Sequence, residues 1–220
     1  MRTLLTAMAA ALLATSAYGN ILVNGSFETP IIPVGTFSSF GVGSTGITGW
    51  TVTGTSGSIA LVNDQFVCCG INYNAADGHQ SVDLTGTDDN GGSKGVSQTV
   101  ILVPGVYMLT YAVGNYSDPN GGGSPFPSTI EVYLDNVLAQ TSTNTNNTTG
   151  QVNWENFSLI FGTPGGPVSI ELRGQGTPSA DNYTGLDGVN LDASPIPEPA
   201  SFFAFGGGLL AIAAKLRKRK

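Results

Sequence analysis

Few residues in this sequence could carry out catalysis. His79 is the sole histidine among 220 residues. Gly41-Val-Gly-Ser-Thr-Gly46 has the spacing of a dinucleotide-binding loop, but such a loop needs a strand before it and a helix after it, and a strand-like segment follows here. Gly91-Gly-Ser-Lys-Gly95 has the spacing of a nucleophile elbow, which requires a later histidine. We therefore expect His79 to be an ordinary loop or strand-edge side chain and the protein not to be an enzyme.

Aromatic residues in loops are the best candidates for ligand contact. Tyr73, Tyr116 and Phe126 lie among glycine, asparagine and proline, whereas Trp50 and Trp154 lie within alternating segments typical of strands. We expect the two tryptophans in the core. For the three loop aromatics, ligand contact and isolated surface exposure both remain open.

Cys68 and Cys69 are the two cysteines of the chain and are adjacent. Neighbouring Cα atoms are about 3.8 Å apart across a trans peptide, which is below the usual disulfide range, so a bond between them would be strained. Three states are consistent with the sequence: a vicinal disulfide, two thiols, or pairing with another chain.

Charge is distributed unevenly along the chain. Of eight Lys and Arg, only Lys94 and Arg173 lie between Asn20 and Ser194, together with fourteen acidic residues. This balance argues against nucleic acid as a partner, because phosphate binding needs clustered Lys and Arg. Acidic loops make calcium plausible instead.

Composition and periodicity favour an all-β fold. The chain has 31 glycines and 12 prolines, and residues 106–113 and 129–134 alternate between apolar and polar. Asp135-Asn136 suits a two-residue hairpin turn because both residues tolerate positive φ. We predict a single antiparallel, jelly-roll-like β-sandwich over residues 20–194, with a polar loop at 141–150. The other strands are expected at 20–23, 46–53, 58–62, 151–161, 168–172 and 183–191.

Both ends of the chain resemble targeting segments. Residues 1–19 contain Arg2, an apolar run and small residues at Ala17 and Gly19, which is the pattern of a secretory signal peptide. Residues 200–214 are almost entirely apolar and a basic cluster follows at once. This run is short for a membrane span, and the basic cluster should stay in the cytoplasm. It indicates a temporary membrane stop or, alternatively, a C-terminal anchor.

The tail also resembles a known signal. Pro197-Glu198-Pro199, the Gly206-Gly207-Gly208-Leu209-Leu210 run and the basic end occur in the order of the PEP-CTERM sorting signal. This resemblance implies a bacterial exported protein that is processed by an exosortase-type enzyme, with a sorting helix at 195–220 that inserts transiently into the inner membrane. It also implies a mature protein at the cell surface or in the extracellular matrix, associated with exopolysaccharide.

The central region resembles galactose-binding-like β-sandwiches of the DUF642 type. The resemblance rests on an ordered set of short motifs: Asn24-Gly-Ser-Phe-Glu28, Gly49-Trp-Thr-Val52, Gly78-His-Gln-Ser-Val-Asp-Leu84, Val96-Ser-Gln-Thr-Val100, Trp154-Glu-Asn-Phe157 and Leu186-Asp-Gly-Val-Asn-Leu191. It implies a non-catalytic, carbohydrate-binding-like domain. A structural or protein-binding module without sugar binding is the alternative.

The same resemblance implies a structural Ca²⁺ where the first and last strands meet. The matching positions are Glu28 and Asp187. Gly188 stands where the family commonly has a second aspartate, so backbone carbonyls or waters would have to complete the six to eight oxygen ligands that calcium takes. A site without an ion, in which both residues only end a turn or strand, remains equally open.

Overall fold

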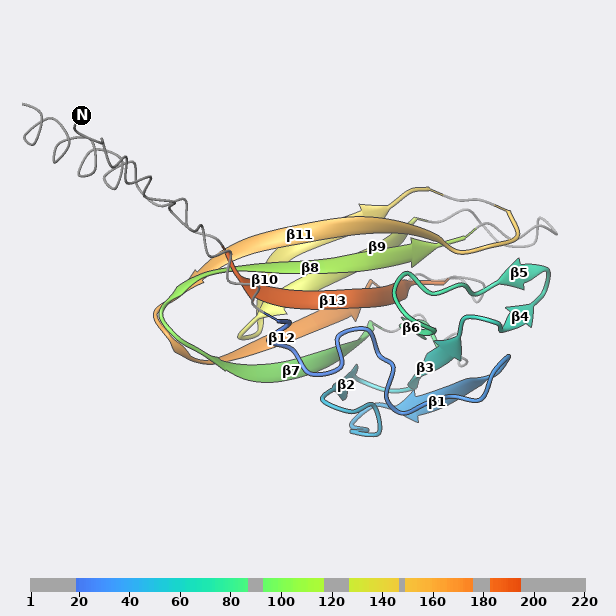
Figure 1. Cartoon of the computed structure of the whole chain (residues 1–220), viewed down its shortest axis with the longest axis horizontal. Helices are drawn as coiled ribbons and strands as arrows, with labels where there is room; N and C mark the ends of the chain where they lie inside the picture. The colour runs from blue at the N-terminus through green and yellow to red at the C-terminus, as the bar shows by residue number, and fades with distance from the viewer. Residues whose placement is uncertain (1–18, 87–92, 117–126, 147–148, 176–182, 195–220) are drawn as a thin grey trace, which may run out of the picture.

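The computed structural model describes residues 19–86, 93–116, 127–146, 149–175 and 183–194. These residues form a sandwich of two antiparallel sheets and contain no helix, which confirms the predicted fold class (Figure 1). No helix in the described ranges is long and apolar enough to cross a membrane. The predicted sorting helix and most of the predicted signal peptide lie outside these ranges.

The first sheet has six strands in the order β1-β3-β6-β13-β8-β11. Its strands are β1 (Phe37–Gly41), β3 (Ser58–Asn63), β6 (Gln80–Asp83), β8 (Gly105–Asn115), β11 (Asn153–Thr163) and β13 (Gly185–Ala193). The second sheet has five strands in the order β10-β9-β12-β7-β2. Its strands are β2 (Thr51–Gly54), β7 (Lys94–Leu102), β9 (Ser128–Leu134), β10 (Val137–Asn144) and β12 (Gly166–Gly174).

A small hairpin, β4 (Val67–Cys68) and β5 (Ile71–Asn72), projects beyond one end of the two sheets (Figure 1). It lies at the end where β8 finishes and β13 begins. That end carries the candidate site described below.

The core lies between the two sheets because inward-facing side chains alternate along each strand. On β8, Tyr107, Leu109, Tyr111 and Val113 are all buried, as the period of two for a strand requires. Trp50 is 2% exposed and its ring centroid lies 5.3 Å from that of Phe27, so its predicted place in the core is confirmed. Trp154 is only half-buried.

The expected strand at 20–23 is wrong, because residues 21–22 form a bend and residues 23–26 form a turn. Asn24 has a φ of 55°, and its side chain bonds the backbone of Thr29 and Thr48 instead of leaving the chain extended. The segment nevertheless lies beside β13, where Gly25 O accepts a bond of 2.9 Å from Val189 N. A Cβ on Gly25 would come within 1.9 Å of Val189 O, so only glycine permits this close approach.

The predicted polar loop at 141–150 is only partly a loop. β10 continues to Asn144, whose amide is fully buried and donates to Val113 O and Asn153 O. These bonds satisfy a polar side chain inside the sandwich. In contrast, the predicted Asp135-Asn136 turn is confirmed, because both residues have positive φ, of 51° and 64°.

Candidate functional site

Three tyrosines gather at the end of the six-stranded sheet. Tyr73 follows β5, Tyr116 follows β8 and Tyr183 precedes β13. The ring centroids are 5.9 Å apart for Tyr73 and Tyr116, 5.5 Å for Tyr73 and Tyr183, and 5.2 Å for Tyr116 and Tyr183. Tyr183 is buried, while Tyr73 and Tyr116 are half-buried at the surface. The structure thus brings two of the predicted contact residues together, and it adds a third that the sequence analysis assigned to a strand.

Two phenylalanines extend this cluster toward β1. The Phe66 ring lies 5.2 Å from Tyr73, and the Phe37 ring lies 5.2 Å from Phe66. We call these five residues the aromatic row: Phe37, Phe66, Tyr73, Tyr116 and Tyr183. Phe126, the third predicted contact residue, lies outside the described residues.

Glycines on two adjacent strands make room for the buried end of the row. A Cβ on Gly185 would lie 2.7 Å from the Tyr183 hydroxyl, and one on Gly114 would lie 2.8 Å from the Trp154 ring. The two glycines are cross-strand partners in the β13–β8 pair. Trp154 in turn donates from Nε1 to Asn74 O over 2.9 Å, which fixes the backbone next to Tyr73.

The environment keeps the hydroxyls of Tyr73 and Tyr183 neutral. Burial raises the pKa of Tyr183 well above its ordinary value, and burial together with the neighbouring Tyr116 does the same for the pKa of Tyr73. A neutral phenol both donates and accepts hydrogen bonds. The row therefore offers apolar ring surface with polar tips, a combination that suits a ligand with both C–H and hydroxyl surface.

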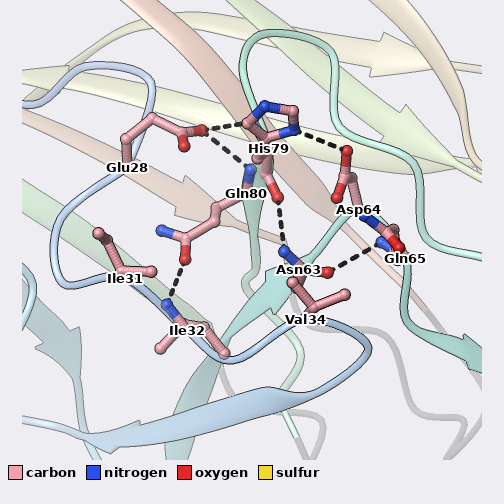
Figure 2. Close-up of a pocket in the computed structure, with 9 residues that line it drawn as sticks. All are labelled: Glu28, Ile31, Ile32, Val34, Asn63, Asp64, Gln65, His79 and Gln80. Atoms are coloured by element: carbon pink, nitrogen blue, oxygen red, sulfur yellow. Dashed lines mark hydrogen bonds and ion pairs between the residues drawn. The ribbon is translucent and has the colours of Figure 1, made fainter.

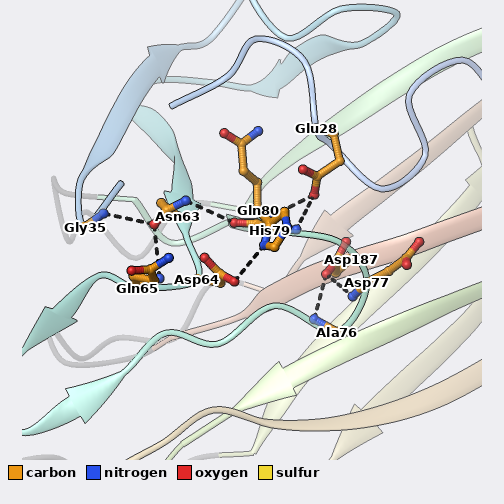
Figure 3. A network of polar contacts seen from close by, with 10 residues as sticks. All are labelled: Glu28, Gly35, Asn63, Asp64, Gln65, Ala76, Asp77, His79, Gln80 and Asp187. Atoms are coloured by element: carbon orange, nitrogen blue, oxygen red, sulfur yellow. Dashed lines mark hydrogen bonds and ion pairs between the residues drawn. The ribbon is translucent and has the colours of Figure 1, made fainter. Parts of the chain in front are cut away.

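The loop after Tyr73 is held at its start by Asp187. Through Oδ2 this carboxylate accepts bonds from Ala76 N (2.8 Å) and Asp77 N (2.9 Å) (Figure 3). Through Oδ1 it accepts a bond from Gly188 N (2.7 Å). Asp187 is completely buried. Burial raises its pKa to about 8, against the opposing effect of the three N–H bonds.

The other end of the loop is held by Glu28. Its Oε1 accepts bonds from His79 N (2.7 Å) and Gln80 N (2.9 Å) (Figure 3). The two residues predicted to share a calcium ion therefore meet on one loop, residues 76–80, and each accepts backbone N–H bonds at one end of it.

This arrangement does not by itself supply a calcium site. The carboxylates of Glu28 and Asp187 face N–H donors, whereas Ca²⁺ needs six to eight oxygen ligands. Within the described ranges, no three His, Cys, Asp or Glu side chains are grouped so that they could hold a metal ion. Calcium stays a prediction, and binding would require the two carboxylates to exchange amide donors for the ion.

A half-open cavity of ≈ 290 Å³ adjoins Glu28. It lies between the loop that contains Ile31, Ile32 and Val34 on one side and the end of β3 with His79 and Gln80 on the other (Figure 2). Gln80 shapes this cavity: its buried amide donates to Phe27 O (2.7 Å) and Pro30 O (3.0 Å) and accepts from Ile32 N. The sequence analysis missed this role, because nothing in the local pattern shows which backbone a glutamine will bond.

His79 forms a pair with Asp64 at the rim of the cavity. Its Nδ1 lies 3.0 Å from Asp64 Oδ2, while 77% of the histidine side chain is exposed (Figure 2). The hydrogen bond to Asp64 and the charge of this carboxylate raise the pKa of His79. The exposed position agrees with the expected loop or strand-edge histidine.

The adjacent cysteines lie at the tip of the β4–β5 hairpin. Cys68 is half-buried and Cys69 is exposed, and their Sγ atoms are 2.7 Å apart as thiols. The sorting residues Pro197, Glu198 and Pro199 lie outside the described residues.

Comparisons with solved structures agree with this architecture. The chain is similar to the Stig cyclase Fisc from Fischerella sp. TAU, at 19% identity over 80% of this chain and 98% of that one, with a TM-score of 0.56. It is also similar to TmCBM61, solved with β-1,4-galactotriose, at 21% identity over 80% of this chain and all of that one (100%), with a TM-score of 0.52. These matches agree with the fold as a β-sandwich.

The sequence itself identifies the family. The chain belongs to the family described as "Protein of unknown function (DUF642)", whose model matches residues 20–187. Residues 195–220 match the PEP-CTERM protein-sorting motif, which marks an exported protein with a membrane-anchored precursor. The comparison with curated proteins gives no match.

Proposed function

We propose that this exported protein binds polysaccharide, without catalysis, at its aromatic row. The observation that carries the proposal is the meeting of Tyr73, Tyr116 and Tyr183 from three separate segments within 6 Å of one another. Two half-buried rings at the surface can pack against the C–H faces of sugar rings, while neutral phenol groups bond hydroxyls. The solved galactotriose complex of TmCBM61 supports this class of ligand.

The partner that fits best is extracellular polysaccharide, with the protein at the cell surface or in the matrix. The sorting motif at 195–220 supports this location and processing by an exosortase-type enzyme. The described part of the sandwich has little positive charge, since Lys94 is buried and Arg173 is paired with Glu171 over 2.8 Å. A neutral polysaccharide therefore fits better than a polyanion.

The cavity beside Glu28 supports a non-catalytic role. The cavity offers no serine, cysteine, threonine, lysine or tyrosine among its described lining residues, so the His79–Asp64 pair has no nucleophile of these types to activate there. Glu28, the other carboxylate that lines the cavity, already accepts two backbone bonds. The similarity to cyclases extends to the fold and does not by itself imply their chemistry.

The proposal is tested by affinity electrophoresis of the protein through gels that contain β-1,4-galactan or extracellular polysaccharide, with and without calcium. Tyr73→Leu and Tyr116→Leu keep an apolar side chain but remove the aromatic ring, and each should weaken retention by about tenfold. Tyr133→Leu is the matched control, because Tyr133 lies on the five-stranded sheet beneath Arg173. Absence of retention in every gel defeats polysaccharide binding, and equal retention of all variants places binding elsewhere.

A protein-binding module is the second candidate, favoured by apolar side chains near the cavity. Ile31 is 87% exposed and Val34 67%, and both line the cavity. Exposed apolar patches mark protein-interaction sites, among other binding surfaces. Under this alternative, Ile31→Ser and Val34→Ser reduce attachment of the protein to cells, while Tyr73→Leu does not.

A further inference from the structure

The tip of the β4–β5 hairpin has a backbone that suits few residues. Cys68 pairs with Ile71, so Cys69 and Gly70 form a two-residue loop. Their φ angles are 56° and 83°. Positive φ at both central positions defines a type I′ turn, in which asparagine, aspartate or glycine is preferred at the first position. This chain has Cys69 there, at a backbone conformation that is costly for a residue with a Cβ.

The sulfur atoms offer a reason for a cysteine at this position. Cys68 Sγ and Cys69 Sγ are 2.7 Å apart, and the turn directs both thiols to the same place. Cys69 is exposed, so a reagent in solution can reach it. An exported protein meets conditions in which disulfides form and persist.

We propose that Cys68 and Cys69 are a redox modification site, at which a small-molecule disulfide oxidises the pair to a vicinal disulfide that locks the hairpin tip. The Cys69 thiolate attacks one sulfur of the small-molecule disulfide and expels one thiolate. The Cys68 thiolate then attacks Cys69 Sγ and expels the second. The two cysteines lose two protons and two electrons in total, and the reagent becomes two thiols.

Both steps of the oxidation depend on pH. In the dithiol, the hydrogen bond with Cys69, and then partial burial, raise the pKa of the Cys68 thiol. Because a thiolate is the attacking species in each step, oxidation accelerates as the pH rises. A ring closed between adjacent residues is strained, so a mild dithiol should reduce it again.

The lock has a structural consequence at the base of the hairpin. Tyr73 N donates to Phe66 O over 3.0 Å, and both residues belong to the aromatic row. Asn72 N donates to Gly150 O over 2.9 Å, which joins the hairpin to the chain before β11. A rigid tip restricts opening of these bonds, so oxidation should slow their amide exchange.

The bond is tested on the exported protein, purified without reductant, denatured and treated with excess alkylating agent. We expect no added label and a mass two hydrogens below that of the dithiol; reduction first should give two labels. Two labels without reduction, or a disulfide-linked dimer, would overturn the proposal. Treatment of the reduced protein with oxidised glutathione should restore the unlabelled monomer, whereas Cys68→Ser should stop at one glutathione adduct.

The lock is tested by hydrogen exchange of the Asn72 and Tyr73 amides in the oxidised and reduced protein. We expect exchange to be several-fold faster after reduction. Cys69→Asn is the matched control, because asparagine accepts the same backbone without forming a bond, and its exchange should not respond to reductant. Equal exchange rates in the oxidised and reduced protein would overturn the locking role.

Discussion

Replacement of Gln80 by leucine tests how the N-terminal loop is fastened over the cavity. The Gln80 side chain is 2% exposed and reaches three backbone groups: Phe27 O, Pro30 O and Ile32 N. Leucine retains much of the volume but removes both the donor and the acceptor. The substitution therefore removes these hydrogen bonds with a limited change in packing.

The expected loss of stability follows from the burial of the backbone groups that Gln80 bonds. Phe27 is 0% exposed and Ile32 is 5% exposed, so water cannot readily replace the lost amide. Each buried group that loses its hydrogen-bond partner costs about 1–3 kcal/mol of stability. The loss of all three bonds should therefore lower the unfolding free energy of Gln80→Leu by about 3–5 kcal/mol. Against a total stability of about 5–15 kcal/mol, this is a large loss.

Urea unfolding, followed by tryptophan fluorescence, measures the effect. Trp50 is a suitable reporter because its ring packs against Phe27. Gln98→Leu is the matched control: Gln98 also holds the N-terminal segment, through two bonds to the backbone of Val23. Val23 is 54% exposed, so water can replace that amide and the expected loss is only about 1–2 kcal/mol.

Comparing Gln80→Leu with Gln98→Leu tests whether burial of the backbone partners determines the loss of stability. The m-value should stay constant, since both variants expose the same surface on unfolding. If Gln80→Leu loses no more stability than Gln98→Leu, the three bonds do not fasten the loop as the structure indicates.

Three further measurements test other parts of the structure. Adding calcium to chelator-treated protein should raise the melting temperature, and at a hundredfold excess of calcium over Kd the unfolding free energy should rise by about 2.7 kcal/mol. Glu28→Ala or Asp187→Ala should abolish the rise. No shift in the unmodified protein refutes the calcium prediction. Burial raises the pKa of Asp83 to about 6. The unfolded value is about 3.9, so the folded state binds the extra proton and stability should fall as pH rises from about 4 to about 6. Asp83→Asn should flatten this part of a melting-temperature profile, and an unchanged slope contradicts the assignment. Gly25→Ala should lower the unfolding free energy by roughly 3 kcal/mol or more, because the new Cβ meets Val189 O at 1.9 Å, and unaltered urea unfolding would rule out this close approach.

The sequence alone was sufficient for elements whose signal is local. The strand predicted at 106–113 lies within β8 and that at 129–134 lies within β9, because alternation reports directly which side chains face the core. The turn at Asp135-Asn136 was predictable because positive φ selects a few residue types. The strand predicted at 20–23 does not form, since side-chain bonds from Asn24 favour turns over extension.

The site depended on contacts that no local pattern encodes. Tyr73 and Tyr116 could be chosen as exposed loop aromatics from their neighbours in the sequence, but their meeting with Tyr183 depends on β8 and β13 pairing side by side. The sequence placed Tyr183 in a strand and gave no sign that its ring would complete the cluster.

The sequence by itself determined the all-β fold, the alternating core and the targeting signal of the tail, because each follows from composition or from short motifs read along the chain. Only the tertiary structure decided what Glu28 and Asp187 contact. Both carboxylates bind backbone N–H groups of residues 76–80, at separations of 51 to 111 residues along the chain. Such partners are selected by how the sheets pack, since a backbone amide carries no residue-specific signal that a sequence can display.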